Sequence, residues 1–248
     1  KIPLEVVVAH LVTFTILIFL GFLISQVAAL ATTDYLHRSS THRGVSFHWS
    51  VEFLMQMILW LTTGINRREW GAVHLCHHAF ADKEGDPHSP ILLGLWPVQL
   101  GNVFLYRKAA KDPKVLWYGR NIRLSWAERT IFKSPYVGLL TGIALVCYLF
   151  GFWQGLIISL THALLYLFLL NNLVNGWCHV RGYKNFRFTL AYNNRFIAAI
   201  TMGEGLHNNH HFRPQRAKLS VKKNEFDIGW GFIKILSYLK LASYNKGM

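Results

Sequence analysis

The chain has 248 residues, of which 52% are apolar and 15% are charged, and its formal net charge is +14. Its three cysteines are too few for a disulfide framework and favour a reducing compartment. Basic blocks flank the apolar segments, as in the cytoplasmic loops of membrane proteins, so we do not expect a nucleic-acid-binding protein.

The first predicted element is a single apolar helix from Leu4 to Leu36. A helix of this length measures about 50 Å, which exceeds the roughly 30 Å hydrocarbon core of a bilayer. We expect its first part to cross the membrane. Its last turns would then carry an H-x-x-x-x-H box, from His37 to His42, to the cytoplasmic side. The apolar run is too long for a signal peptide.

Two later stretches are predicted to lie at or near the membrane surface. Phe47 to Thr63 is apolar on more than one side but too short to span, so we expect a buried or interfacial helix. The stretch from Leu92 to Lys133 mixes aromatic and basic residues, as segments at a lipid headgroup surface do.

Between these stretches, a predicted helix carries His74, His77 and His78. Their i, i+3, i+4 spacing places the three imidazoles on one helix face. His48 and His88 lie nearer to loops, so we expect them to support the ligands or to be exposed, not to bind metal.

Two apolar arms, Pro135 to Phe150 and Phe152 to Val174, are joined by a short uncharged turn and predict a membrane hairpin. His162 lies inside the second arm. We interpret it as a hydrogen-bonded core residue, although ionisable groups at membrane depth are often functional. The hairpin leads to Asn175 and His179, which share a helix face.

A second H-x-x-H-H box follows at His207, His210 and His211. The two glycines just before it allow a close approach of the backbone. The tail, from Phe226 to Tyr244, has a helical period and is expected to pack on the cytoplasmic domain or on the membrane face.

Nine of the thirteen histidines therefore lie in boxes or next to them. Imidazole nitrogen binds zinc, copper, iron and nickel. Nine imidazoles are too many for one ion, since a structural zinc takes four ligands and a catalytic zinc three from the protein. Two metals with four or five ligands each would use all nine, so the pattern predicts a dinuclear centre.

We predict an all-α integral membrane protein with three to four transmembrane helices and a cytoplasmic helical cap that carries a His-rich di-metal site. Four regions form one integrated domain: an N-terminal transmembrane helix (1–36), His-box and interfacial helices (37–134), a transmembrane hairpin (135–175) and a C-terminal His-box segment (176–248). The expected location is a bacterial inner membrane, with the active site on the cytoplasmic side.

The order of these pieces resembles that of the membrane-bound fatty-acid desaturases of the acyl-CoA, stearoyl delta-9 type, from about His37 to Leu241. The supporting pieces are His37-Arg-Ser-Ser-Thr-His42, Asn66 with Glu69-Trp70, His74 to His78 followed by Asp86-Pro87-His88, Asn175 with His179, and Gly203-Glu-Gly-Leu-His-Asn-Asn-His-His211.

The resemblance implies a di-iron oxidoreductase that uses O2 and external electrons to introduce a cis double bond, at position delta-9, into a long acyl chain. Asn175 would reach one of the two iron ions through water. The implied metal ligands are His37, His42, His74, His77, His78, His179, His207, His210 and His211.

A tunnel would present one methylene pair of the acyl chain to the metals. Asn66 and Trp70 are candidates for the head-group end of this tunnel, with ordinary packing and helix capping as the alternative. Asp86 and Glu204 are candidates for carboxylates that orient the imidazoles. Expected partners are membrane lipids, O2, an electron donor such as ferredoxin or cytochrome b5, and an acyl substrate carried by CoA, acyl carrier protein or a lipid.

Two alternatives remain open. A hydroxylase, a ketolase or an alkene-forming decarboxylase could use the same histidine boxes, because spacing does not fix the fate of the substrate. A membrane metal transporter would instead place its ligands near the bilayer midplane. Only His10 and His162 are expected at that depth here.

Overall fold

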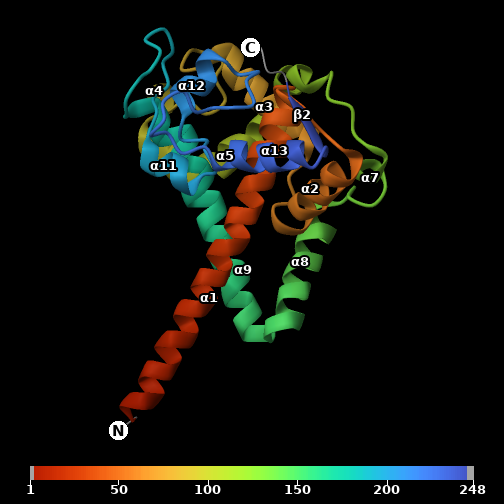
Figure 1. Cartoon of the computed structure of the whole chain (residues 1–248), viewed down its shortest axis with the longest axis vertical. Coiled ribbons are helices and arrows are strands. Elements are labelled where there is room, and N and C mark those ends of the chain that lie inside the picture. Colours follow the sequence, from red (N-terminus) through yellow and green to blue (C-terminus); the bar gives the residue numbers. More distant parts are fainter. Residues whose placement is uncertain (1–2, 245–248) are drawn as a thin grey trace.

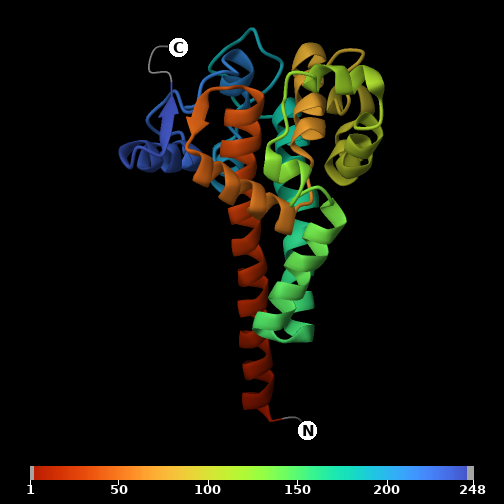
Figure 2. The ribbon, with the colours of Figure 1, turned by 90° about the vertical axis from the view of Figure 1, so that its right-hand side faces the viewer.

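The computed structural model describes residues 3–244, most of which are helical. Figures 1 and 2 show long helices extending from one end of the molecule and a group of shorter helices, which we call the cap, at the other end. Helix α1, Leu4–Ala31, continues without a break into the π-helix η1, Thr32–Thr41, and enters the cap. The single helix predicted from Leu4 to Leu36 is therefore five residues longer and delivers the first histidine box on η1.

The predicted hairpin is present as two helices and their continuation. Helix α8, Pro135–Phe150, and helix α9, Phe152–Leu164, are joined at Gly151, whose φ of +91° favours glycine. The second arm continues through two π-helical segments, η3 (Leu165–Leu170) and η4 (Leu173–Trp177), into the short α10 (Cys178–Val180).

Two helical stretches, Leu4–Thr41 and Phe152–Val180, are long and apolar enough to cross a membrane, and Pro135–Phe150 is a shorter apolar helix. Their outer surfaces carry exposed apolar side chains such as Leu140 and Leu160, as expected of helices that face lipid. Within residues 3–244, length and composition thus give two candidate spans and one short companion helix, and the three to four spans stay a prediction.

Helices α1 and α9 pack closely where α1 has no side chain. A Cβ atom added to Gly21 would lie 2.6 Å from the Cβ atom of Thr161. One turn further along, His162 Nδ1 lies 3.1 Å from Ser25 Oγ, and its Nε2 lies 2.8 Å from the carbonyl oxygen of Thr62. His162 is therefore the hydrogen-bonded core residue that we expected.

The cap contains the remaining helices. They are α2 (Trp49–Thr62), α3 (Arg67–Phe80), α4 (Pro90–Leu93), α5 (Leu95–Ala109), α6 (Pro113–Leu116), η2 (Trp117–Gly119), α7 (Trp126–Arg129), α11 (Arg195–Ile200), α12 (His207–Phe212) and α13 (Ile228–Tyr238).

A small antiparallel sheet joins the two ends of the cap. Strand β1, Val45–Phe47, pairs with strand β2, Ala242–Tyr244, with Val45 opposite Tyr244. The fold is mostly helical, as predicted, and this short sheet is an addition that the sequence did not predict. The tail is helical only as far as Tyr238. Strands of three residues are too short to show a period of two.

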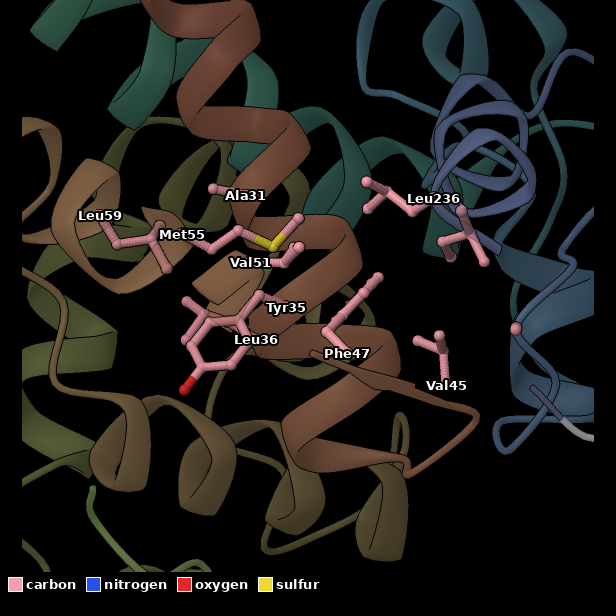
Figure 3. Packing of buried hydrophobic residues seen from close by; sticks show 11 residues of the cluster. Ala31, Tyr35, Leu36, Val45, Phe47, Val51, Met55, Leu59 and Leu236 are labelled. Carbon is pink, nitrogen blue, oxygen red and sulfur yellow. The ribbon is translucent and has the colours of Figure 1, made fainter. Parts of the chain in front are cut away.

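The core of the cap surrounds η1. Tyr35 and Leu36 of η1 are buried and pack with Val51 and Met55 of α2, and Leu236 of α13 belongs to the same cluster (Figure 3). Full burial of one such side chain contributes about 1.5–3 kcal/mol. This packing fixes the orientation of η1, and with it the first histidine box.

Candidate metal centre

The structure brings all nine box histidines together in two adjacent groups. Within each group, the potential ligand nitrogens all lie within 4.8 Å of one another. The first group is His37, His42, His74, His78 and His210, and the second is His77, His179, His207 and His211.

Each H-x-x-H-H box contributes to both groups. On α3, His74 and His78 belong to the first group and the ring of His77 belongs to the second. Helix α12 does the reverse, because His207 and His211 join the second group while His210 joins the first. In both helices the i, i+4 pair shares a group, since these residues lie one above the other on the helix surface. The two boxes therefore interlock.

The ring nitrogens converge at short distances. In the first group, His37 Nε2 lies 3.0 Å from His210 Nε2, and His42 Nε2 lies 2.9 Å from His74 Nε2. In the second group, His179 Nε2 lies 2.9 Å from His207 Nε2.

Carboxylates set the tautomer of three of these rings. The Nδ1 atoms of His37, His77 and His179 lie 2.8 Å, 3.0 Å and 2.7 Å from carboxylate oxygens of Glu204, Asp86 and Asp82, respectively. Each Nδ1–H therefore donates to a carboxylate, which leaves a lone pair on Nε2.

Glu204 and Asp86, the two carboxylates named in the sequence analysis, thus contact imidazoles. Asp82 was missed. It lies four residues after His78 with a φ of +57°, and four residues before Asp86. An acidic residue so close to a histidine box was the available signal.

The donor set fits two metal ions. Lone pairs that face each other at these distances repel unless a cation lies between them. Two nitrogens bound at about 2.1 Å to one ion, with an angle of about 90° between the bonds, are separated by about 3 Å. The separations from 2.8 Å to 3.4 Å between neighbouring Nε2 atoms match this geometry.

Burial favours the neutral, metal-binding form of the imidazoles. It lowers the pKa far below the usual histidine value in six of the nine: His42, His74, His78, His207, His210 and His211. Burial alone would raise the pKa of Asp86, but the hydrogen bond and the charge of His77 lower it to about 2. The imidazoles remain available as ligands and the carboxylate stays ionised.

Arg38 extends this network away from the metal groups. Its guanidinium is buried, makes an ion pair with Asp227 at 2.8 Å, and donates to the carbonyl oxygen of Ala217. Burial would raise the pKa of Glu204, but the neighbouring His37 and Arg38 lower it. Arg38 therefore keeps the carboxylate that orients His37 ionised, a role that the sequence analysis did not identify.

A second polar network fixes the short helix α12. The side-chain oxygen of Asn208 accepts hydrogen bonds from the backbone N–H groups of Asn185 and Phe186. At the entry to α12, a Cβ atom added to Gly205 would lie 2.2 Å from the backbone nitrogen of Ala198. The glycine predicted to allow a close backbone approach does so here.

A cavity of about 580 Å³ reaches the metal groups, and its lining includes His37, His74 and His207. The three predicted residues Asn66, Trp70 and Asn175 also line it. The ring of Trp70 stacks on the ring of His74 at 4.9 Å. Asn66 in addition caps α3, since its side chain accepts from two backbone N–H groups, so lining and capping coexist at this residue.

The two histidines expected to lie outside the ligand set differ in position. His48 is exposed and caps α2. His88 is buried, lines the cavity, and lies with its ring 4.7 Å from that of His77. Neither belongs to the two groups that the nine histidines form, but His88 belongs to a third possible metal-binding group, with His77 and Asp86.

Comparison with known proteins gives one consistent result. Residues 10–219 match the family model described as fatty acid desaturase. An acyl-CoA C20 Delta5-desaturase of Anemone leveillei is 30% identical over 222 residues, which cover 86% of this chain and 68% of the relative. An icosanoyl-CoA 5-desaturase of Limnanthes douglasii is 29% identical over 235 residues, or 92% of this chain and 64% of the relative.

A more distant relative, the delta-9 acyl-lipid desaturase 2 of Arabidopsis thaliana, is 24% identical over 236 residues, which cover 91% of this chain and 73% of the relative. The chain thus spans about two thirds of the length of the first two relatives.

Proposed function

Because the chain belongs to the fatty acid desaturase family, a family of oxidoreductases, we propose that it is a membrane-bound enzyme that introduces a cis double bond into a long fatty-acyl chain. The observation that carries the proposal is the convergence of nine imidazoles, from four segments of the chain, beside one cavity that three of them line.

The two histidine groups would each hold one iron ion, and Asn175 would reach one of them through water. Iron bound there would supply the oxygen activation and hydrogen abstraction that desaturation of an unactivated chain requires. Zinc fits the imidazoles equally well but has no redox chemistry.

The residues of the chain prepare this site in three ways. Glu204, Asp86 and Asp82 hold imidazole rings in one tautomer and one orientation. Burial of the rings excludes bulk water from the reacting groups. Apolar side chains such as Leu139 and Leu167 line the cavity and offer contacts to methylene groups.

The mouth of the cavity suits the polar end of the substrate. Arg107 and Lys111 are exposed and line the same cavity as the histidines. Two cationic side chains favour an anionic carrier such as CoA, and the names of two relatives refer to acyl-CoA or icosanoyl-CoA. An acyl-lipid substrate, named for another relative, is the alternative.

The proposed position of the double bond is delta-9, as the resemblance to the stearoyl delta-9 type implies. Position 5, named for the first two relatives, is the alternative. The basic loops favour a site on the cytoplasmic side under the positive-inside bias, where an acidic ferredoxin or a cytochrome b5 would deliver electrons.

The fatty-acid profile of cells that express the chain tests this proposal. Mass spectrometry should find an acyl chain that has lost two hydrogen atoms, and derivatisation of the double bond should locate it. An acyl chain that has gained oxygen would instead indicate hydroxylation, and a shortened terminal alkene would indicate decarboxylation.

A further inference from the structure

The nine histidines differ in their exposure and in their contact with the cavity. The cavity is lined by His37, His74 and His207, but not by His78 or His211. Seven of the nine histidines are no more than 9% exposed, whereas His78 and His211 are partly exposed. His78 and His211 are thus the most exposed of the nine rings.

The exposed pair connects both groups. His78 belongs to the first group and His211 to the second, and their rings stack at 4.4 Å with an interplanar angle of 20°. Any electron carrier that reaches this pair from outside lies next to both proposed metals at once. A carrier on the cavity side would compete with the acyl chain.

Three arginines lie close in sequence to histidine ligands of both groups. Arg43 follows His42 directly, and Arg213 lies two residues after His211. The two segments are in contact, because a Cβ atom on Gly44 would lie 2.6 Å from the carbonyl oxygen of Gln215. Arg216 belongs to the same turn, since its backbone N–H donates to the carbonyl oxygen of Arg213.

These charges are not neutralised within the protein. Between residues 3 and 244, no ion pair includes Arg43, Arg213 or Arg216. Arg43 and Arg213 are exposed. Helix α12, which precedes Arg213, lies at the end of the molecule far from the α8–α9 hairpin, and is therefore remote from the apolar arms of the proposed membrane segments (Figures 1 and 2).

An aromatic side chain, Phe212, lies next to Arg213 in the chain. Phe212 is 38% exposed, and its ring stacks on that of Phe186 at 3.9 Å. The Arg213 guanidinium lies 5.6 Å from the centre of the Phe212 ring. Electron-transfer complexes have small interfaces, below about 1,200 Å², and depend on complementary charge for encounter. An apolar spot with a rim of like charge meets both requirements.

We propose that Arg43, Arg213 and Arg216, around Phe212, form the docking surface for an acidic one-electron carrier protein, which delivers its electrons at the His78–His211 pair. The inference rests on the proposed function. Reduction of O2 to two water molecules takes four electrons. The two C–H bonds of the substrate supply two electrons and two protons, so the carrier must supply the other two electrons, one at a time, and the solvent two protons.

Binding of purified, iron-loaded protein to two acidic probes tests the proposal: the soluble haem domain of a cytochrome b5 and a [2Fe–2S] ferredoxin. Arg213→Glu and Arg216→Glu should each weaken binding of the preferred probe by about tenfold or more at low ionic strength. The matched control is Arg129→Glu, because Arg129 is also exposed but lies on α7, across the cap from α12 (Figure 1). It should change binding by less than about twofold.

Iron content must be equal in all four proteins, which separates a docking defect from a damaged metal site. Equal losses in the Arg129 and Arg213 variants, or no loss in the Arg213 variant, overturn the proposal, as does a wild-type protein that binds neither probe. Reduction by dithionite, which replaces the carrier protein, tests the desaturase function separately from docking. If the Arg213 variant forms single-turnover product under dithionite but not with the carrier, the docking surface and the desaturase function are both supported. Absence of acyl product from the wild-type protein under dithionite refutes only desaturation.

Discussion

The histidines of this chain act in pairs and triplets whose spacing is visible in the sequence. Because i, i+3 and i+4 positions share a helix face, His74, His77 and His78 could be assigned to one site without coordinates. The division of each triplet between two groups could not, since it depends on how α3 and α12 face each other. Arg38 was missed for the same reason, because its partner Asp227 is distant in sequence. Asp82 was identifiable as an acidic residue near a histidine box, but its partner His179 was not.

Removal of one imidazole from either histidine group should lower the amount of iron that the centre binds. We expect His77→Ala and His210→Ala to abolish desaturation and to lower the iron bound per chain, measured by elemental analysis, because each contributes a nitrogen to the converging set. His48→Ala, which changes an exposed residue, should retain wild-type iron and activity. Equal damage by all three substitutions would refute the ligand assignment.

Loss of a carboxylate that orients a ring should weaken metal binding without removing a ligand. For Asp82→Asn we expect iron affinity or activity to fall about 10–100-fold, since His179 loses its charged partner. Asp112→Asn is the matched control, because Asp112 is exposed and caps α6, a role that asparagine also fills. An Asp82→Asn protein with unchanged iron affinity would show that orientation by this carboxylate is unimportant.

At the scale of helices and strands, long apolar runs were the reliable signal. The N-terminal helix and both arms of the hairpin begin and end close to the predicted residues, because an apolar run and a glycine turn mark them locally. The π-helical geometry of η1 and the β1–β2 pair was not predictable. Both depend on tertiary packing, and the two strands are separated by nearly the whole chain.

Helix α11 lies close to the start of α12 because Gly205 has no side chain. Gly205→Ala would place a Cβ atom 2.2 Å from the Ala198 backbone nitrogen, so we expect a lower melting temperature and less bound iron. Gly101→Ala on α5 is the control, since nothing lies within 4 Å of its added Cβ atom and alanine favours a helix by about 0.5–1 kcal/mol. Thermal unfolding in detergent compares the two. A Gly205→Ala protein as stable as the Gly101→Ala protein would contradict the packing described here.

Across the whole molecule, the buried imidazoles couple stability to pH. Six histidines have a pKa far below the usual 6.5 in the folded protein, so the unfolded chain binds more protons below that pH. Stability of the metal-free protein is then greatest above pH 6.5. As the pH falls below this value, stability decreases by about 1.4 kcal/mol per pH unit for each histidine.

The loss for each histidine ends at its folded pKa, which for His88 is about 3. Asp86, with a folded pKa of about 2, adds a further loss below its usual value of 3.8. Melting curves of the metal-free protein between pH 7.5 and 5 measure the histidine effect. A melting temperature that stays constant over this range would show that the rings are not held neutral.

The central proposal is that nine imidazoles hold two metal ions, and the ratio of iron to protein tests this most directly. Elemental analysis of the purified chain, loaded with iron under reducing conditions and freed of loosely bound metal, should find two iron ions per chain, and alanine at His77 or His210 should lower that number. One ion per chain, or zinc that iron cannot replace, would contradict the proposed centre.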